Sequence, residues 1–257
     1  MIRAVLIALL AASAARAQEP RSSSKAYTSA PASAAKTSLL PPDTDLIDEP
    51  TAGVLDHGGF SSRTRFFNQG GVAEWLSFGV YPRLNIGGSL NIDQLLGTGT
   101  PIKVASPELQ AKFRFYDGDR IIPAFAVGFD HQGWLYNRPE QRYNQRQRGL
   151  YFVGSQEIGV PGLQAHAGMN ISDFNSSKVF GFFGLSQNIS DKVLLMAEWD
   201  NVRTYSDSRL NMALRTYVSP NLALDFGGRG VGQGGHFTNG VSRGAERFVQ
   251  IKYIGSF

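Results

Sequence analysis

The sequence has no cysteine among its 257 residues. This absence excludes disulfide bonds, thiolate metal sites, cysteine nucleophiles and lipid attachment through an N-terminal cysteine. Charged residues are also scarce, at 18% against about 25% in a typical soluble protein. The 4 methionines stand beside 29 glycines and 17 phenylalanines, a bias that favours strands and tight turns over helices. The net charge of +4 is mild and requires no nucleic-acid partner, so we expect none.

Long hydrophobic runs are missing as well. The apolar run from Ala4 to Ala12 follows a short positive start and precedes the small-x-small pattern Ala15-Arg16-Ala17, which is typical of a cleavable signal peptide over residues 1–17. This run is too short for a membrane-spanning helix, which needs roughly 20 apolar residues. Residues 18–49 are rich in Ser, Ala and Pro and lack an apolar period, so they predict a disordered leader. If the remainder crosses a membrane, it must do so as a β-barrel.

Residues 50–257 form a succession of strand-like segments of roughly ten residues each. Within 84–93, Leu84, Ile86, Leu90 and Ile92 share one face and polar or small residues occupy the other. Similar alternation occurs within 109–116, 163–172, 211–218, 222–229 and 247–257. Segments near 60–69, 72–81, 121–130, 149–157, 179–188 and 192–201 alternate less regularly. The total is about twelve, an even number as bacterial barrels require.

The connections between these segments alternate in length. Tight turns are predicted at 81–83, 117–120, 160–162, 190–192 and 219–221. Longer connections lie near 94–107, 131–148, 201–208 and 230–244, and two further connections in the long set, near 69–71 and 173–178, are short. Short periplasmic turns opposite long external loops are typical of outer-membrane barrels.

These patterns predict an all-β fold, a single transmembrane antiparallel up-and-down β-barrel of about twelve strands over residues 50–257. We expect it in the bacterial outer membrane, with both termini periplasmic and with lipid or lipopolysaccharide around it. The polar strand faces would then line the interior. The alternative is an exported β-sandwich or lipocalin-like barrel, whose interior would have to be apolar.

The last segment alternates up to the final residue, with Val249, Ile251, Tyr253, Gly255 and Phe257 on one face. Such a strand needs a partner, and a closed barrel supplies one because its last strand pairs with its first. We expect this partner near residues 61–68. A terminal aromatic strand also resembles the assembly signal of outer-membrane barrels, which predicts contact with the barrel-assembly machinery. Gly255 stands where that signal prefers a bulky apolar residue.

Two groups of residues are candidates for binding. Charged side chains on the polar strand faces either line a route for a charged solute or pair with one another inside a narrow, filled lumen: Lys112, Arg114, Glu198, Asp200, Arg215, Asp225, Arg229 and Lys252. Arginines and aromatic residues of the long connection at 131–148 could hold lipopolysaccharide phosphates or an acidic polysaccharide, or belong to a solvated external loop: Trp134, Tyr136, Arg138, Arg142, Tyr143, Arg146 and Arg148.

Catalysis has little support in the sequence. His57, His131, His166 and His236 are scattered, and their spacing indicates neither a metal pair nor a nucleophile triad. We therefore expect no enzymatic activity, no metal and no cofactor.

Several stretches resemble the YjbH-type outer-membrane proteins, which are associated with exopolysaccharide or capsule production. These stretches are 50–55 (PTAGVL), 112–118 (KFRFYDG), 149–151 (GLY) and 244–247 (GAER). The resemblance covers about 51–257 and implies a non-enzymatic barrel that serves export or assembly of surface exopolysaccharide. Members of that family are often longer, so this chain would correspond to a single barrel unit. The alternatives are a general porin or structural barrel, or an outer-membrane lipid-modifying enzyme.

Overall fold

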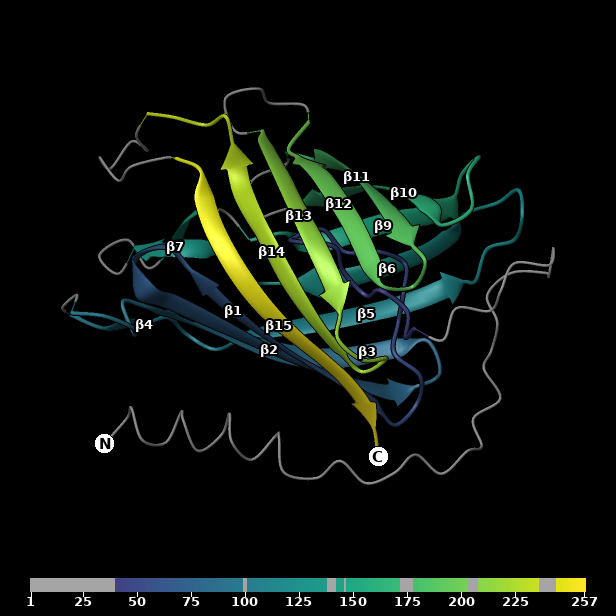
Figure 1. Cartoon of the computed structure of the whole chain (residues 1–257), viewed down its shortest axis with the longest axis horizontal. Helices are drawn as coiled ribbons and strands as arrows, with labels where there is room; N and C mark the ends of the chain where they lie inside the picture. The colour runs from purple at the N-terminus through teal and green to yellow at the C-terminus, as the bar shows by residue number, and fades with distance from the viewer. Residues whose placement is uncertain are drawn as a thin grey trace.

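The computed structural model describes residues 40–98, 101–137, 142–145, 147–171, 178–202, 208–235 and 244–257. In this part of the chain, twelve antiparallel strands close into a barrel, as predicted from the alternation (Figure 1). They are β1 (Gly59–Phe67), β2 (Gly71–Tyr81), β3 (Leu84–Asp93), β5 (Glu108–Tyr116), β6 (Ala124–Asp130), β9 (Gly149–Glu157), β10 (Leu163–Ile171), β11 (Phe180–Ile189), β12 (Val193–Asp200), β13 (Arg209–Tyr217), β14 (Leu222–Val231) and β15 (Glu246–Ser256).

Three short strands lie in the connections. β4 (Lys103–Val104) pairs with β3, and β7 (Trp134–Asn137) and β8 (Arg142–Gln145) form a separate hairpin. A 3-10 turn, η1 (Asn68–Gly70), joins β1 to β2. No helix among the described residues has the length and hydropathy needed to cross a membrane.

The seam of the barrel lies between β1 and β15. The register runs from Gly59 opposite Ser256 to Phe67 opposite Phe248, and the Phe257 N–H donates to the Gly58 carbonyl at 3.0 Å. This confirms the predicted pairing of the last strand with the first. Because Gly59 and Ser256 are partners, β1 begins and β15 ends at the same end of the barrel, which is the end that carries the tight turns.

The two faces of the barrel wall differ in polarity. Exposed side chains on the outer face are mostly large and apolar, as at Leu109, Met169 and Phe226. The inner face carries buried charges, among them Arg215 and Glu198. A soluble barrel would show the reverse, so the wall has the pattern of a membrane-spanning barrel.

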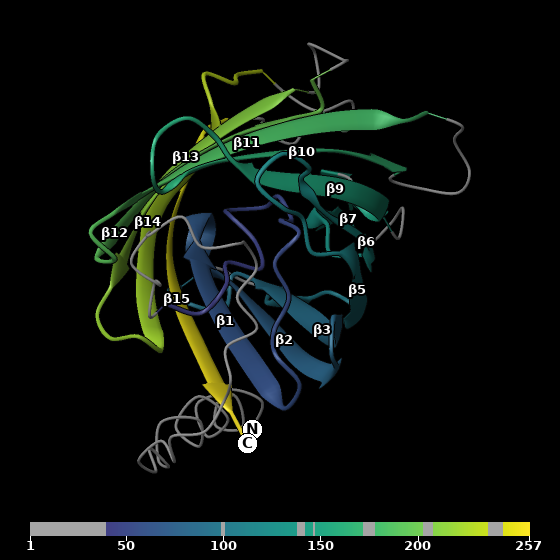
Figure 2. The same cartoon turned by 90° about the vertical axis from the view of Figure 1, so that its right-hand side faces the viewer.

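One finding differs from the expectation for residues 18–49. Residues 43–55, which we call the lumen segment, lie inside the ring of strands (Figure 2). The segment folds back on itself: Asp45 pairs with Pro50, and the Leu46 N–H donates to the Glu49 carbonyl at 2.9 Å. A disordered leader therefore cannot extend to residue 49, because Leu46 to Glu49 form a fixed and buried tip.

Candidate functional site in the barrel lumen

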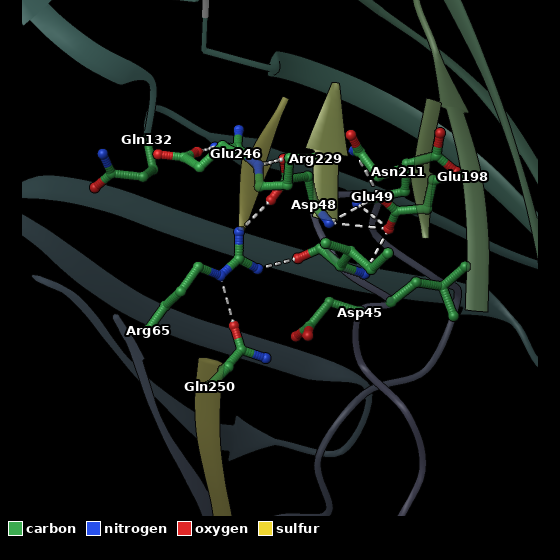
Figure 3. Close-up of polar contacts among 12 residues, drawn as sticks. Asp45, Asp48, Glu49, Arg65, Gln132, Glu198, Asn211, Arg229, Glu246 and Gln250 are labelled. Carbon is green, nitrogen blue, oxygen red and sulfur yellow. Dashed lines mark hydrogen bonds and ion pairs between the residues drawn. The ribbon is translucent and has the colours of Figure 1, made fainter. Parts of the chain in front are cut away.

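The tip of the lumen segment is held by one carboxylate of the wall. The backbone N–H groups of Ile47, Asp48 and Glu49 all donate to Glu198 Oε1, the latter two at 2.9 Å. Asn211 Nδ2 donates to Glu198 Oε2 at 3.1 Å and fixes the carboxylate from the other side. Consecutive N–H groups directed at one anion form a nest, so β12 and β13 supply a dedicated receptor for this turn (Figure 3).

Asp48 makes the central ion pairs of the site. Its carboxylate accepts from Arg65 Nη1 at 2.6 Å and from Arg229 Nε at 2.5 Å. Arg65 comes from β1 and Arg229 from β14, on either side of β15 in the wall. Arg65 also donates to the Ile47 carbonyl at 2.6 Å and to Gln250 Oε1 at 2.9 Å. The segment is thus bound across the barrel seam.

The other aspartates of the segment have basic partners too. Asp45 pairs with Arg63 at 2.8 Å and with Lys252 at 3.4 Å, and Asp43 pairs with Arg215. Arg215 also holds Asp225 in a two-pronged contact at 2.8 and 2.9 Å. Planar guanidinium groups suit such two-pronged binding of carboxylates.

The returning half of the segment is held through its backbone. Lys112 Nζ donates to the carbonyls of Thr44 and Gly53, the second at 3.1 Å. Ser155 Oγ accepts from the Ala52 N–H at 2.8 Å, and Asn85 Oδ1 accepts from the Leu55 N–H at 3.1 Å. These donors and acceptors satisfy backbone groups that burial would otherwise leave unpaired.

Apolar and aromatic side chains form a second layer around the tip. Leu46 and Ile47 are fully buried against residues of the inner wall and of β7: Phe67, Ala73, Trp75, Trp134, Leu194, Met196 and Phe248. The Arg229 guanidinium lies 3.9 Å from the centre of the Trp134 ring, and that of Arg65 lies 4.5 Å from the centre of the Phe248 ring. The aromatic faces therefore orient the same guanidinium groups that bind Asp48.

The acids of the segment differ in their electrostatic state. Burial alone would raise the pKa of Asp45, but the charges of Arg63, Lys252 and Arg215 outweigh it and hold that pKa well below its usual range. For Asp48, Arg229 and Arg65 likewise outweigh burial and lower the pKa. Glu49 is the exception, because burial and then the neighbouring Glu198 raise its pKa well above the usual value.

The hairpin β7–β8 places part of the predicted external loop over the lumen. Trp134 and Tyr143 are buried, and the Tyr143 hydroxyl donates to Glu108 at 3.0 Å while its ring lies 5.1 Å from that of Tyr136. Gln145 accepts from Arg229 at 3.2 Å. The hairpin thus contacts the lumen network through Tyr143 and Gln145.

The arginines predicted for this loop have different positions. Arg148 is buried in the lumen, where it binds Asp200 at 3.2 Å and the Asp48 carbonyl at 3.2 Å. Arg138, Arg146 and the side chain of Arg142 lie outside the described residues. Glycan or phosphate binding by these residues stays a prediction.

The predicted lumen residues come together, with one exception. Lys112, Glu198, Asp200, Arg215, Asp225, Arg229 and Lys252 are all buried within the lumen network. Arg114 instead pairs with Asp117 at 2.9 Å beside the turn between β5 and β6.

Sequence reasoning missed the acids of the lumen segment and two arginines of the network. Arg63 and Arg65 lie on β1, whose alternation is irregular because polar residues occupy both faces. The composition of the lumen segment could have indicated its acidic role. The stretch 43–49 (DTDLIDE) contains four acids and no base, opposite an excess of arginines on the polar strand faces.

Some space remains beside the segment. A cavity of about 60 Å³ lies between it and the wall of β2, β3, β5 and β6, lined by residues that include Asp45, Arg63, Lys112, Asp130 and Tyr151. The lumen segment itself fills the space around its tip, where Leu46, Ile47 and Glu49 are fully buried.

Among the histidines that the structure describes, His166 lies on the inner face of the wall and is buried. Its ring lies between Ser155 Oγ, 2.8 Å from Nδ1, and Ser186 Oγ, 3.2 Å from Nε2. No carboxylate among the described residues hydrogen-bonds this ring, so the orienting acid of a triad is missing there. The described residues likewise contain no group of three or more His, Asp or Glu placed to hold a metal ion.

Comparisons with known proteins give similarities of fold at low identity. No family model and no curated protein matches the chain. Among solved structures, the KdgM porin is 10% identical, with a TM-score of 0.49, over 77% of this chain and 99% of that one. The NanC porin is 8% identical, with a TM-score of 0.37, over 77% and 99%. The outer-membrane channel DcaP of Acinetobacter baumannii is 9% identical, with a TM-score of 0.27, over 77% and 96%.

Proposed function

We propose that this chain is a bacterial outer-membrane barrel that passes an acidic surface polysaccharide, or fragments of one, through a basic lumen closed at rest by the lumen segment. The observation that carries the proposal is the charge of the two sides. All charged side chains of residues 43–55 are acidic. The side chains that bind this segment are mainly basic: Arg63, Arg65, Lys112, Arg148, Arg215, Arg229 and Lys252.

The same bases would serve an acidic polymer once the segment leaves. Several guanidinium groups would then lose their carboxylate partners inside a poorly hydrated space, which is unfavourable unless another anion replaces them. Carboxylate or phosphate groups spaced along a glycan offer the same two-pronged geometry. The segment therefore resembles a bound substrate in its chemistry. The sequence resemblance to YjbH-type proteins supports a surface exopolysaccharide as the source of the acids.

The topology supports a direction of entry. We assign the end with the tight turns, where β1 begins and β15 ends, to the periplasm, as is usual for outer-membrane barrels. The lumen segment enters from this end, since Tyr217 beside the β13–β14 turn donates to Asp43 at 3.2 Å. A polymer leaving the cell would meet the segment first and could replace it contact by contact.

A second candidate is a structural barrel with no solute. The buried tip and its ion pairs favour it, because they could serve stability alone. The two candidates differ in what happens when the segment is absent.

Deletion of residues 43–55 separates them. We expect the folded deletion variant to form an anion-selective channel in planar lipid bilayers, with currents that acidic oligogalacturonates reduce and neutral dextrans of equal length do not. Because exposed charges are screened, the selectivity should weaken as salt rises from 0.1 to 1 M. A matched deletion of residues 22–34 should leave the barrel closed. A deletion variant that is folded by heat-modifiable gel mobility but non-conducting, or cation-selective, contradicts the proposal and leaves the structural barrel.

A further inference from the structure

An acidic residue, Glu74, lies on the outer face of the barrel. In the register of β1 and β2, Arg63 is opposite Trp75 and Thr64 is opposite Glu74. The Arg63 guanidinium stacks 4.1 Å from the centre of the Trp75 ring and pairs with Asp45 inside the lumen. Successive strand residues point to opposite faces, so Thr64 and Glu74 point outward.

Two hydroxyls hold the Glu74 carboxyl in place. Ser62 Oγ donates to Oε1 at 2.8 Å, and Thr64 Oγ1 donates to Oε2. The three residues, which we call the outer polar cluster, come from two adjacent strands. Thr64 is buried although it faces outward, because the glutamate side chain covers it, and Glu74 itself is half-buried.

The surroundings of the cluster are apolar. Glu74 is the fourth of the eleven residues of β2, and Val72 and Leu76 flank it on the same face. Leu90 is opposite Glu74 on β3, and Phe66 lies beside Val72 on β1. Elsewhere in the described strands, outward-facing polar side chains lie near strand ends: Gln156, Gln187, Thr216 and Arg247.

A carboxyl group in the apolar band is unfavourable unless it has a partner, and intramembrane ionisable groups therefore mark functional sites by default. Each oxygen of Glu74 has a neutral hydroxyl as its partner, so the carboxyl has no basic partner on the outer face. The nearest basic residue, Arg63, is on the opposite face of the wall and is occupied by Asp45 and Trp75. A basic group that pairs with Glu74 on the outer face would therefore have to come from another molecule.

We propose that the outer polar cluster is a docking site for a membrane-embedded segment of a partner protein, which presents a lysine or arginine to Glu74. Anionic lipid headgroups do not fit, since their phosphates repel the carboxylate. A second copy of this chain does not fit either. Among the basic residues of the described barrel strands, Arg247 alone faces outward, and it lies at the loop end of β15, opposite Gly228. Two-fold pairing at the cluster would bring two carboxyls together.

The shape of the wall agrees with a docked segment. Gly88 faces outward on β3, opposite Leu76 and diagonal to Glu74, so no side chain fills the surface there. Because glycine has no side chain, the backbone of another segment can approach the wall closely beside the carboxyl. Small residues allow the same close approach at interfaces within membranes. The inference depends on the membrane location proposed above and not on what passes through the lumen.

Photo-crosslinking in cells tests the site on the full chain. A photoreactive amino acid at Leu76 should give an adduct of defined mass, and the same probe at Leu195, on the outer face of β12, should not. We expect Glu74→Leu to reduce the adduct about tenfold, and Glu74→Gln to reduce it as well, because both remove the charge. The crosslinked partner peptide should lie in a membrane-embedded stretch that contains a lysine or arginine.

A stability measurement distinguishes docking from a structural role. If the cluster serves docking, purified Glu74→Leu barrels should unfold at the same temperature as the parent or a higher one, because a carboxyl group without a basic partner on the outer face is removed from the apolar band. A lower unfolding temperature would show that the hydrogen bonds of the cluster serve only to stabilise the pairing of β1 with β2, and this result would overturn the proposal. Three crosslinking results also overturn the proposal. They are equal adduct yields from probes at Leu76 and Leu195, an adduct with twice the mass of the chain, and an adduct yield that does not change when Glu74 is replaced. A parent protein absent from the outer-membrane fraction refutes the membrane location instead.

Discussion

At the scale of single residues, Glu49 differs from the other acids of the lumen segment. Neither of its carboxyl oxygens has a hydrogen-bond donor among the described residues. Burial, followed by the negative charges of Glu198 and Asp200, raises its pKa well above the usual 4.5. Asp45 and Asp48 keep their charge because arginines contact them directly. Glu49 is therefore protonated in the closed barrel at a pH where it would ionise in water.

This difference predicts that closure weakens as the pH rises. An acid whose pKa is raised in the closed state contributes fully below its free pKa of about 4.5, and its contribution is lost as the pH rises through the raised value. Between these two values, the free energy of closure should fall by about 1.4 kcal/mol per pH unit. We expect the open probability in planar bilayers to rise from pH 5 to pH 9.

Two variants check the source of this pH dependence. Glu49→Gln keeps the shape of the side chain but cannot ionise, so its open probability should stay flat over the same range. Glu157→Gln, at the exposed end of β9, should behave as the parent does. An unchanged pH profile in Glu49→Gln would assign the effect to another group of the lumen.

At the scale of elements, β11 has a glycine where the tip of the lumen segment meets the wall. A Cβ atom at Gly184 would lie 2.7 Å from Glu49 Oε2 and 2.7 Å from Leu46 Cδ1. The absence of a side chain at Gly184 thus makes room for the tip of the lumen segment. Gly181, on the same strand but on the outer face, would place its Cβ no nearer than 3.9 Å to Gly168 O.

The prediction is that Gly184→Val expels the segment while the barrel stays folded. Overpacking typically costs about 1–3 kcal/mol, which corresponds to a roughly tenfold to hundredfold weaker closure. Limited proteolysis of the purified barrel should cleave within residues 43–55 in Gly184→Val, and more slowly in the parent and in Gly181→Val. Equal cleavage rates in all three would show that the wall yields to the larger side chain instead.

The elements also show how far the sequence predicts this fold. β3 and β10 alternate cleanly because one face meets lipid and the other the lumen. β1 alternates poorly because Ser62 and Thr64 face outward, and this hid the inward Arg63 and Arg65. The lumen segment lacks a period altogether. Its structure depends on partners such as Glu198, 151 residues away from Ile47, and such contacts leave no local pattern.

At the scale of the whole molecule, closure of the barrel depends on a seam between the first strand and the last. β1 and β15 pair over nine residues, and Arg65, Gln250 and Asp225 continue this link inside the lumen. Of all neighbouring strands in the barrel, these two are the farthest apart in the sequence. The outer edge of the seam is covered by Phe257, whose ring stacks on that of Phe60 at 5.0 Å and lies 6.4 Å from that of Phe78.

Deletion of Phe257 is predicted to impair assembly in cells more than it destabilises the folded barrel. The residue is 89% exposed and adds one backbone hydrogen bond and two ring contacts, with Phe60 and Phe78, to a seam that is otherwise intact, so we expect a loss of about 1–2 kcal/mol. Refolding from urea into lipid vesicles should therefore reach nearly the parental yield. In cells, the heat-modifiable fraction in the outer membrane should fall several-fold, and Phe257→Tyr should restore it, because the aromatic end is what the assembly machinery would bind. Equal losses in vesicles and in cells would mean that Phe257 acts through stability, and normal assembly in cells would mean that the paired seam is sufficient without it.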